Sequence, residues 1–152
     1  MTVNELIVAL DAVPYPYNGN PVLIRTPGGI GGWSGVNGIY PSGAPPAAGP
    51  PQVLITAKTV AFFPGNPAGT WKIIPLTGFF NLYTPQTLSA RLQTMVASYG
   101  NAQVFLHEGF YTPLAVTSVA VDPRTTSLVT AVVLQADGSG PGWNGAVPVV
   151  DP

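Results

Sequence analysis

Charged side chains are scarce in this chain. Only 7% of its 152 residues are charged, and five Lys and Arg against six Asp and Glu leave a net charge of −1, whereas ordinary soluble domains carry about 25% charged residues. The cations lie singly along the sequence, so they cannot form the basic stripe that neutralises nucleic-acid phosphates. We therefore expect no nucleic acid as a partner, and a largely neutral surface that suits contact with neighbouring subunits.

Cysteine is absent and there is a single histidine. These absences exclude disulfides, thiolate nucleophiles and cysteine-type zinc sites. His107 neighbours Glu108, but adjacent residues of a strand point to opposite faces, and no spacing supports a hydrolase built on His107 and Asp122. Calcium-loop and dinucleotide-loop spacings are also missing. The sequence predicts no enzyme, no catalytic residue, no metal and no cofactor.

Long apolar runs are missing too. The runs at residues 6–10 and 131–134 are far shorter than the roughly 18–20 residues that span a bilayer. The N-terminal segment also lacks the basic region of a secretory signal. We expect no membrane segment, and synthesis in a cytoplasm.

Glycine and proline are abundant, at 18 residues each. Val, Leu, Ile and Phe are still frequent enough for a core, and the length fits a single domain over residues 1–152. Gly and Pro concentrate in residues 27–51, which we interpret as a long loop or arm. Within it, Trp33, Ile39 and Tyr40 bury apolar area only if something covers them. Either they fold back as a satellite core, or they bind a partner, or the segment is disordered.

Two helices have clear start signals. Thr2 and Glu5 have the spacing of a capping box, and Thr84 is a good N-cap before Pro85 at the first helical position. The sequence predicts helices over residues 3–13 and 86–98. Runs rich in β-branched and aromatic residues predict strands at residues 21–24, 52–63, 70–74, 79–83, 103–110, 114–121, 127–135 and 146–150.

The two helices resemble copies of one another. A shift of 82 positions aligns Thr2 with Thr84, Leu6 with Leu88, Leu10 with Leu92, Tyr17 with Tyr99 and Val22 with Val104. Further on, residues 54–57 resemble residues 128–131 at a smaller shift. We interpret residues 2–75 and 84–150 as internal repeats of an α-β-β unit, with chance similarity of two amphipathic helices as the alternative. The expected fold is α+β, with two helices packed on a mixed, mainly antiparallel sheet.

The opening segment carries a resemblance. Thr2-Val-Asn-Glu-Leu-Ile-Val-Ala-Leu-Asp-Ala-Val-Pro14, followed by Pro21-Val-Leu-Ile24, resembles the start of small uncharacterised proteins of bacteria and tailed bacteriophages. The resemblance implies a phage-encoded or phage-derived accessory protein, with no catalytic residues to carry over. The Gly/Pro-rich segment and the low charge are also similar in character to capsid decoration and minor virion proteins.

Two classes of function stay open. The first is a non-enzymatic virion subunit, such as a capsid decoration or minor capsid protein, that binds the major capsid protein or like subunits as a homo-oligomer. Trp33, Ile39 and Tyr40 are then the partner-binding residues. The alternative is a carbohydrate- or surface-binding module, because aromatic faces and neutral hydrogen-bonding groups suit sugars. Its candidate aromatic residues are Trp33, Trp71 and Trp143, of which Trp71 falls in a strand-like run typical of a core.

Overall fold

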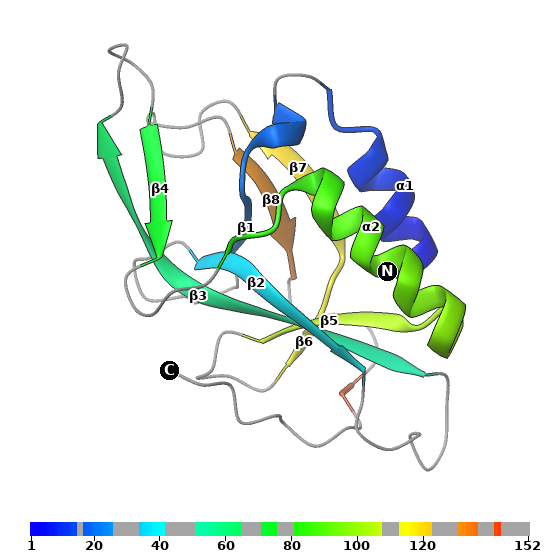
Figure 1. The fold of residues 1–152 in the computed structure, drawn as a ribbon. Helices are drawn as coiled ribbons and strands as arrows, with labels where there is room; N and C mark the ends of the chain where they lie inside the picture. The colour runs from blue at the N-terminus through cyan, green and yellow to red at the C-terminus, as the bar shows by residue number, and fades with distance from the viewer. Residues whose placement is uncertain are drawn as a thin grey trace.

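The computed structural model describes residues 1–14, 17–25, 34–41, 51–64, 71–75, 81–107, 113–122, 131–136 and 142–143. Two α-helices and a mixed sheet make up this part of the chain (Figure 1), which confirms the expected α+β fold. In chain order the elements are α1 (Val3–Asp11), η1 (Tyr17–Gly19), β1 (Val22–Arg25), β2 (Ser34–Pro41), β3 (Gln52–Pro64), β4 (Trp71–Pro75), α2 (Pro85–Tyr99), β5 (Gln103–His107), β6 (Leu114–Ala115), β7 (Ser118–Asp122) and β8 (Ala131–Gln135).

Both helices begin where their sequence signals place them. The Glu5 N–H donates to Thr2 Oγ1 over 3.3 Å and the Thr2 N–H donates to Glu5 Oε2 over 2.7 Å, which is the predicted capping box. α2 begins at Pro85 behind its N-cap Thr84. It ends at Gly100, whose φ of 79° is a conformation that glycine adopts at little cost.

The sheet curls back on itself. Its strand order is β6-β5-β3-β2-β1-β8-β7, with β4 paired to β3 outside this order. Only Val116 and Thr117 separate the two end strands, and their N–H groups donate to Val104 O and Gln135 O. β6 and β7 therefore act as one bent strand that closes the order into a ring. The β1–β8 and β3–β5 pairs are parallel and the other pairs are antiparallel.

The interpretation of residues 27–51 as a loop or arm is wrong for residues 34–41. These residues form β2, which pairs with β1 on one side and β3 on the other. Its glycines mark close contacts, because a Cβ on Gly35 would lie 2.7 Å from Leu82 Cδ2 and one on Gly38 would lie 2.7 Å from Thr56 Oγ1. Glycine in this strand thus permits tight packing, which composition alone cannot distinguish from flexibility. Trp33 and the remainder of residues 27–51, apart from Pro51, lie outside the described residues.

Several strand boundaries also differ from expectation. Residues 81–83 precede α2 outside any strand, and the run at 114–121 is divided into β6 and β7. Of the expected strand at 127–135, residues 131–135 form β8 and residues 127–130 lie outside the described residues. The expected strand at 146–150 lies outside the described part of the chain. The division at Val116 and Thr117 occurs where the chain leaves β5 and pairs with β8 instead.

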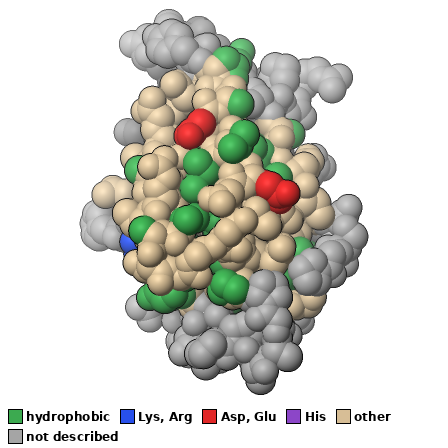
Figure 2. Space-filling view, turned by 90° about the vertical axis from the view of Figure 1, so that its right-hand side faces the viewer, with side chains coloured by type: hydrophobic (Ala, Val, Ile, Leu, Met, Phe, Trp, Pro, Cys, Tyr) green, Lys and Arg blue, Asp and Glu red, His purple; other side chains and the backbone are tan. Residues whose placement is uncertain are grey.

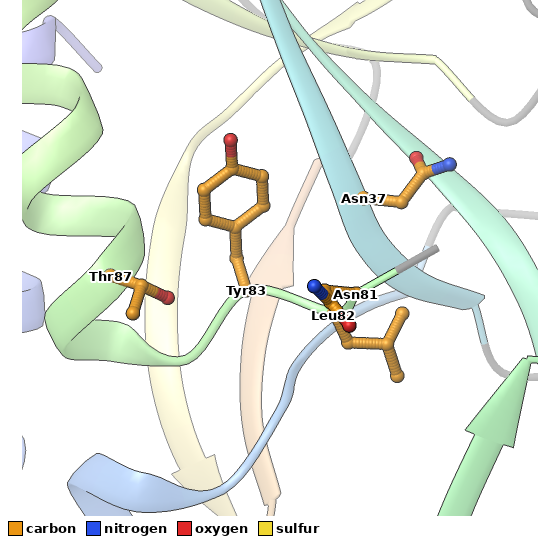
Figure 3. A pocket seen from close by; sticks show the side chains of 5 residues that line it. All are labelled: Asn37, Asn81, Leu82, Tyr83 and Thr87. Atoms are coloured by element: carbon orange, nitrogen blue, oxygen red, sulfur yellow. The ribbon is translucent and has the colours of Figure 1, made fainter. Parts of the chain in front are cut away.

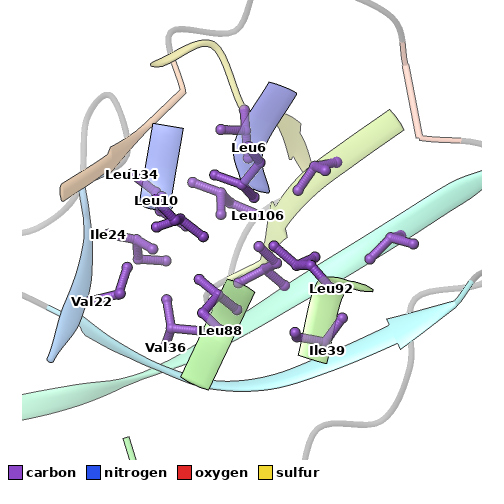
Figure 4. Packing of buried hydrophobic residues seen from close by; sticks show 14 of the residues in the cluster. Leu6, Leu10, Val22, Ile24, Val36, Ile39, Leu88, Leu92, Leu106 and Leu134 are labelled. Carbon is purple, nitrogen blue, oxygen red and sulfur yellow. The ribbon is translucent and has the colours of Figure 1, made fainter. Parts of the chain in front are cut away.

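The core lies between the helices and one face of the curled sheet (Figure 4). Leu6 and Leu10 of α1 and Leu88 and Leu92 of α2 are all at most 2% exposed. The two helices are also joined by a hydrogen bond, in which the Ser89 hydroxyl of α2 donates to Asp11 Oδ1 of α1 over 2.6 Å. In another buried cluster of the described residues, Leu54, Phe105 and Ala115 pack with Trp143.

The two halves of the chain pair their strands in matching register. The β1–β2, β2–β3 and β1–β8 pairs map onto the β5–β6, β7–β8 and β5–β3 pairs at constant offsets: 82 positions for β1 and β5, 80 for β2 and β6/β7, and 79 for β3 and β8. The β3–β4 pair has no counterpart among the described residues. The matching pairs are Leu23–Gly35 with Phe105–Ala115, Gly38–Thr56 with Ser118–Gln135, and Val22–Val132 with Val104–Val53. This connectivity agrees with the 82-residue shift, while the alignment of residues 54–57 with 128–131 is displaced, because β3 and β8 correspond at 79. A duplication as the origin of the two halves stays a prediction.

The residue before each N-cap is inserted into the strands of the other half. Tyr83, which precedes α2, donates its N–H to Val36 O over 2.9 Å and accepts from the Val22 N–H over 2.8 Å. Met1, which precedes α1, does the same with Val116 O at 2.9 Å and the Val104 N–H at 3.1 Å. Each half thus satisfies backbone groups of the other, which favours one cooperative domain.

The buried helix contacts predict a large loss of stability on truncation. Leu88 is 0% exposed, so Leu88→Ala should lower the free energy of unfolding by about 2–5 kcal/mol, from lost apolar burial and the cavity left behind. Val8 is 69% exposed, and Val8→Ala should change it by less than about 0.5 kcal/mol. Urea unfolding followed by circular dichroism measures both. Equal losses in the two variants would contradict this placement of the core.

Candidate functional site

Two of the three expected partner-binding residues, Ile39 and Tyr40, lie in the described part of the chain, and they face different sides of the sheet. Ile39 is 5% exposed and belongs to the core, whereas Tyr40 is 46% exposed. Adjacent residues of a strand face opposite sides of the sheet, so Ile39 and Tyr40 cannot share one binding surface. The assignment of Ile39 to a partner contact is therefore wrong. Tyr40 is accessible, and Trp33 lies outside the described residues.

Of the three tryptophans expected to bind sugar, Trp143 is the one whose side chain the structure describes. Trp143 is half-buried and packs edge-on against Phe105, with ring centroids 5.3 Å apart. Trp71 lies in β4, where its backbone pairs with Pro64. The packing of Trp143 is that of a core residue, in agreement with the ordinary role of a large aromatic side chain.

The described surface carries few charges. Among its exposed residues only Glu5, Asp11 and Arg91 are charged, and the large apolar side chains Val8, Tyr40 and Tyr99 are 69%, 46% and 50% exposed. Figure 2, a view turned toward the helices, shows apolar side chains among mostly neutral atoms, with two separate acidic groups. This surface fits the neutral character expected from the composition.

A pocket of about 390 Å³ lies where β2 meets the start of α2 (Figure 3). It is lined by Asn37 of β2, by Asn81, Leu82 and Tyr83 of the segment before α2, and by Thr87 in the first turn of α2. None of the described lining residues is charged. The volume falls within the range of about 300–1,000 Å³ that is typical of small-molecule sites.

Asn37 is placed in this pocket by a β-bulge. The register of β2 against β3 shifts between Val36 and Gly38, so Asn37 has no partner residue on β3. The inserted residue changes the alternation of faces, which lets both Val36 and Ile39 face the core. The Thr56 hydroxyl, in a residue only 1% exposed, donates to Asn37 Oδ1 over 3.0 Å. The bulge and this bond together orient the Asn37 carboxamide.

Leu82, Tyr83 and Thr87 are held by separate contacts. Leu82 packs on the bare backbone of Gly35, and Tyr83 is held by its backbone bonds to Val36 and Val22. Thr87 completes the second capping box, because its Oγ1 accepts from the Thr84 N–H over 2.8 Å. The walls of the pocket are therefore set by the fold before any ligand arrives.

The described part of the chain gives little support for catalysis by His107 or for a metal site. His107 is 5% exposed and pairs in register with Thr56, Asp122 is the last residue of β7, and Glu108 lies outside the described residues. No three His, Asp or Glu residues gather into a metal site within the described ranges. No described helix is long and apolar enough to cross a membrane.

Comparison with known proteins adds no relative: no family model, curated protein or solved structure matches this chain.

The sequence analysis did not identify the pocket, although one signal for it was present. Gly35-Val36-Asn37-Gly38 places two glycines around a polar residue next to apolar positions, a pattern that marks a bulge or a close backbone approach in a strand. The high glycine content of the neighbouring residues obscured that signal. Asn81, which also lines the pocket, lies 44 positions after Asn37 in the chain, so no local pattern links the two residues.

The bond that orients Asn37 can be tested by an isosteric change. Thr56→Val removes the hydroxyl but keeps the shape, so it should lower the free energy of unfolding by about 1–2 kcal/mol and shift the Asn37 side-chain amide resonances. Thr59→Val, at an exposed position of the same strand, should change stability by less than about 0.5 kcal/mol. Urea unfolding and two-dimensional NMR measure these effects. Unaltered Asn37 resonances in Thr56→Val would contradict the assigned role.

Proposed function

We propose that this chain is a non-enzymatic structural subunit that binds an assembled protein lattice, most concretely a capsid decoration or minor capsid protein of a bacteriophage virion. The observation that carries the proposal is the surface. Among the described exposed residues three are charged, while Val8, Tyr40 and Tyr99 present apolar area to solvent. Such a surface is suited to burial against neighbouring subunits.

Apolar burial is the main source of affinity available to such a surface. Removing apolar area from water contributes roughly 25 cal/mol per Å² before the costs of association, whereas an exposed ion pair contributes about 0–1 kcal/mol. Tyrosine is also among the residues that most often dominate interface energetics. The proposal therefore makes Tyr40 and Val8 partner-contacting residues.

The phage assignment has its support in the resemblance of the opening helix and strand to proteins of bacteria and tailed phages. In this proposal the partner is the major capsid protein or further copies of this chain, and the protein resides in the virion. Carbohydrate binding through exposed tryptophans has less support, because Trp143 packs against Phe105.

Quantitative mass spectrometry of virions tests the assignment directly. Particles of a phage that encodes this chain should contain it in a constant ratio to the major capsid protein, unchanged by repeated density-gradient purification. A chain that is absent from the particles, or is lost progressively with purification, contradicts the proposal. Light scattering of the purified chain measures its own oligomeric state in parallel.

Binding to the particle should depend on apolar contacts and little on salt. Tyr40→Ala and Val8→Asp should each weaken binding to particles assembled without the chain by about tenfold or more. The Arg91 side chain donates a hydrogen bond to Thr94 of its own helix. Arg91→Ala should therefore weaken binding to the particle less than about threefold. Affinity should also change little between low and moderate ionic strength and carry a negative heat-capacity change. A steep loss with salt, or a dominant effect of Arg91→Ala, would contradict an apolar interface.

A further inference from the structure

We propose that the pocket between β2 and α2 binds an uncharged sugar unit, either free or as part of a polysaccharide. The inference does not rest on the proposed role in a virion. It rests on the pocket formed by Asn37, Asn81, Leu82, Tyr83 and Thr87 (Figure 3).

The chemistry of the lining selects the ligand class. Each Asn carboxamide has two donors and an oxygen acceptor, which matches sugar hydroxyls that both donate and accept. The half-buried Tyr83 ring and Leu82 supply apolar area for the C–H faces of a sugar ring. The described lining residues include neither a cation to hold a phosphate or carboxylate nor an anion to hold an amine. A neutral ligand rich in hydroxyl groups fits this set.

The polar groups are positioned in advance. The Thr56 hydroxyl holds Asn37 Oδ1 at 3.0 Å, which directs the carboxamide of a residue that the bulge removes from strand pairing. Tyr83 is held through its own backbone on both sides. Groups that are already ordered lose less conformational entropy on binding, so weak individual contacts can still yield measurable affinity.

The pocket residues differ from the residues at the equivalent positions of the other half. The offsets of 80 and 82 positions equate Asn37 with Thr117, Tyr83 with Met1 and Thr87 with Glu5. The second location thus carries neither the carboxamide nor the aromatic ring, and Glu5 brings a negative charge. In both halves the backbone of the residue before the N-cap bonds two strands, but these backbone bonds do not require the side chains of Asn37 and Tyr83. Departures of this kind from a shared pattern are expected at functional sites.

NMR titration of the full chain tests the proposal. We would add glucose, galactose and N-acetylglucosamine separately, each to about 50 mM, because a single sugar ring in an open pocket is expected to bind with a dissociation constant of about 1 mM. At least one sugar should produce saturable shifts in the side-chain amides of Asn37 and Asn81 and in the backbone of Tyr83. Oligosaccharides of that sugar, titrated next, distinguish a polysaccharide ligand from a free one by tighter binding.

A matched pair of variants separates this pocket from other surfaces. Asn81 is exposed, so Asn81→Ala should leave the fold intact and weaken sugar binding about tenfold, as expected for the loss of its hydrogen bonds. Asn4→Ala removes an exposed carboxamide from α1 and should leave binding unchanged.

Three results would overturn the proposal. The first is the absence of saturable shifts with all three sugars. The second is sugar binding that Asn81→Ala and Asn4→Ala affect equally. The third is tighter binding of an uncharged N-acetyl amino-acid amide than of any sugar, which would assign the pocket to a peptide.

Discussion

The exchange of backbone hydrogen bonds by Met1 and Tyr83 is the constraint on which the rest of the structure depends. Tyr83 lies between Val22 and Val36, and Met1 lies between Val104 and Val116. Each bond crosses from one half of the chain to the other, so the strands of one half are completed by the segment that starts the helix of the other. The N-termini of α1 and α2 are thereby placed against the sheet, and the leucines that follow are directed into the shared core.

The position of Tyr83 between Val22 and Val36 also shapes the pocket. With Tyr83 bonded to Val36, the preceding Leu82 comes against Gly35, where a Cβ would lie 2.7 Å from Leu82 Cδ2. The chain of β2 then bulges at Asn37 before it resumes pairing at Gly38. Because the bulge lies next to the start of α2, a strand residue and helix residues line one cavity. The pocket thus depends on the bulge at Asn37 in the pairing of β2 with β3, and bulges are frequent beside functional sites.

The scarcity of charge limits what the molecule can use for recognition. Long-range electrostatic steering is weak when few charges are present, so specificity has to come from shape, apolar burial and neutral hydrogen bonds. Both proposals, a lattice-binding surface and a neutral sugar pocket, use these three sources. They concern different residues, Val8 and Tyr40 in one case and Asn37 and Asn81 in the other.

The local elements of this protein can be predicted from the sequence, because caps and apolar periodicity are properties of neighbouring residues. Thr2 with Glu5 and Thr84 with Pro85 located both helix starts, and the shift of 82 positions anticipated the matching β1 and β5. That residues 34–41 are a central strand and that Ile39 is a core residue follows from long-range packing. The reason is that the space beside Gly35 is filled by Leu82, 47 positions away, and no local pattern distinguishes a glycine that is flexible from one that is packed against. The pocket has the same origin, since Asn37 and Asn81 become neighbours only after the two halves have exchanged their hydrogen bonds.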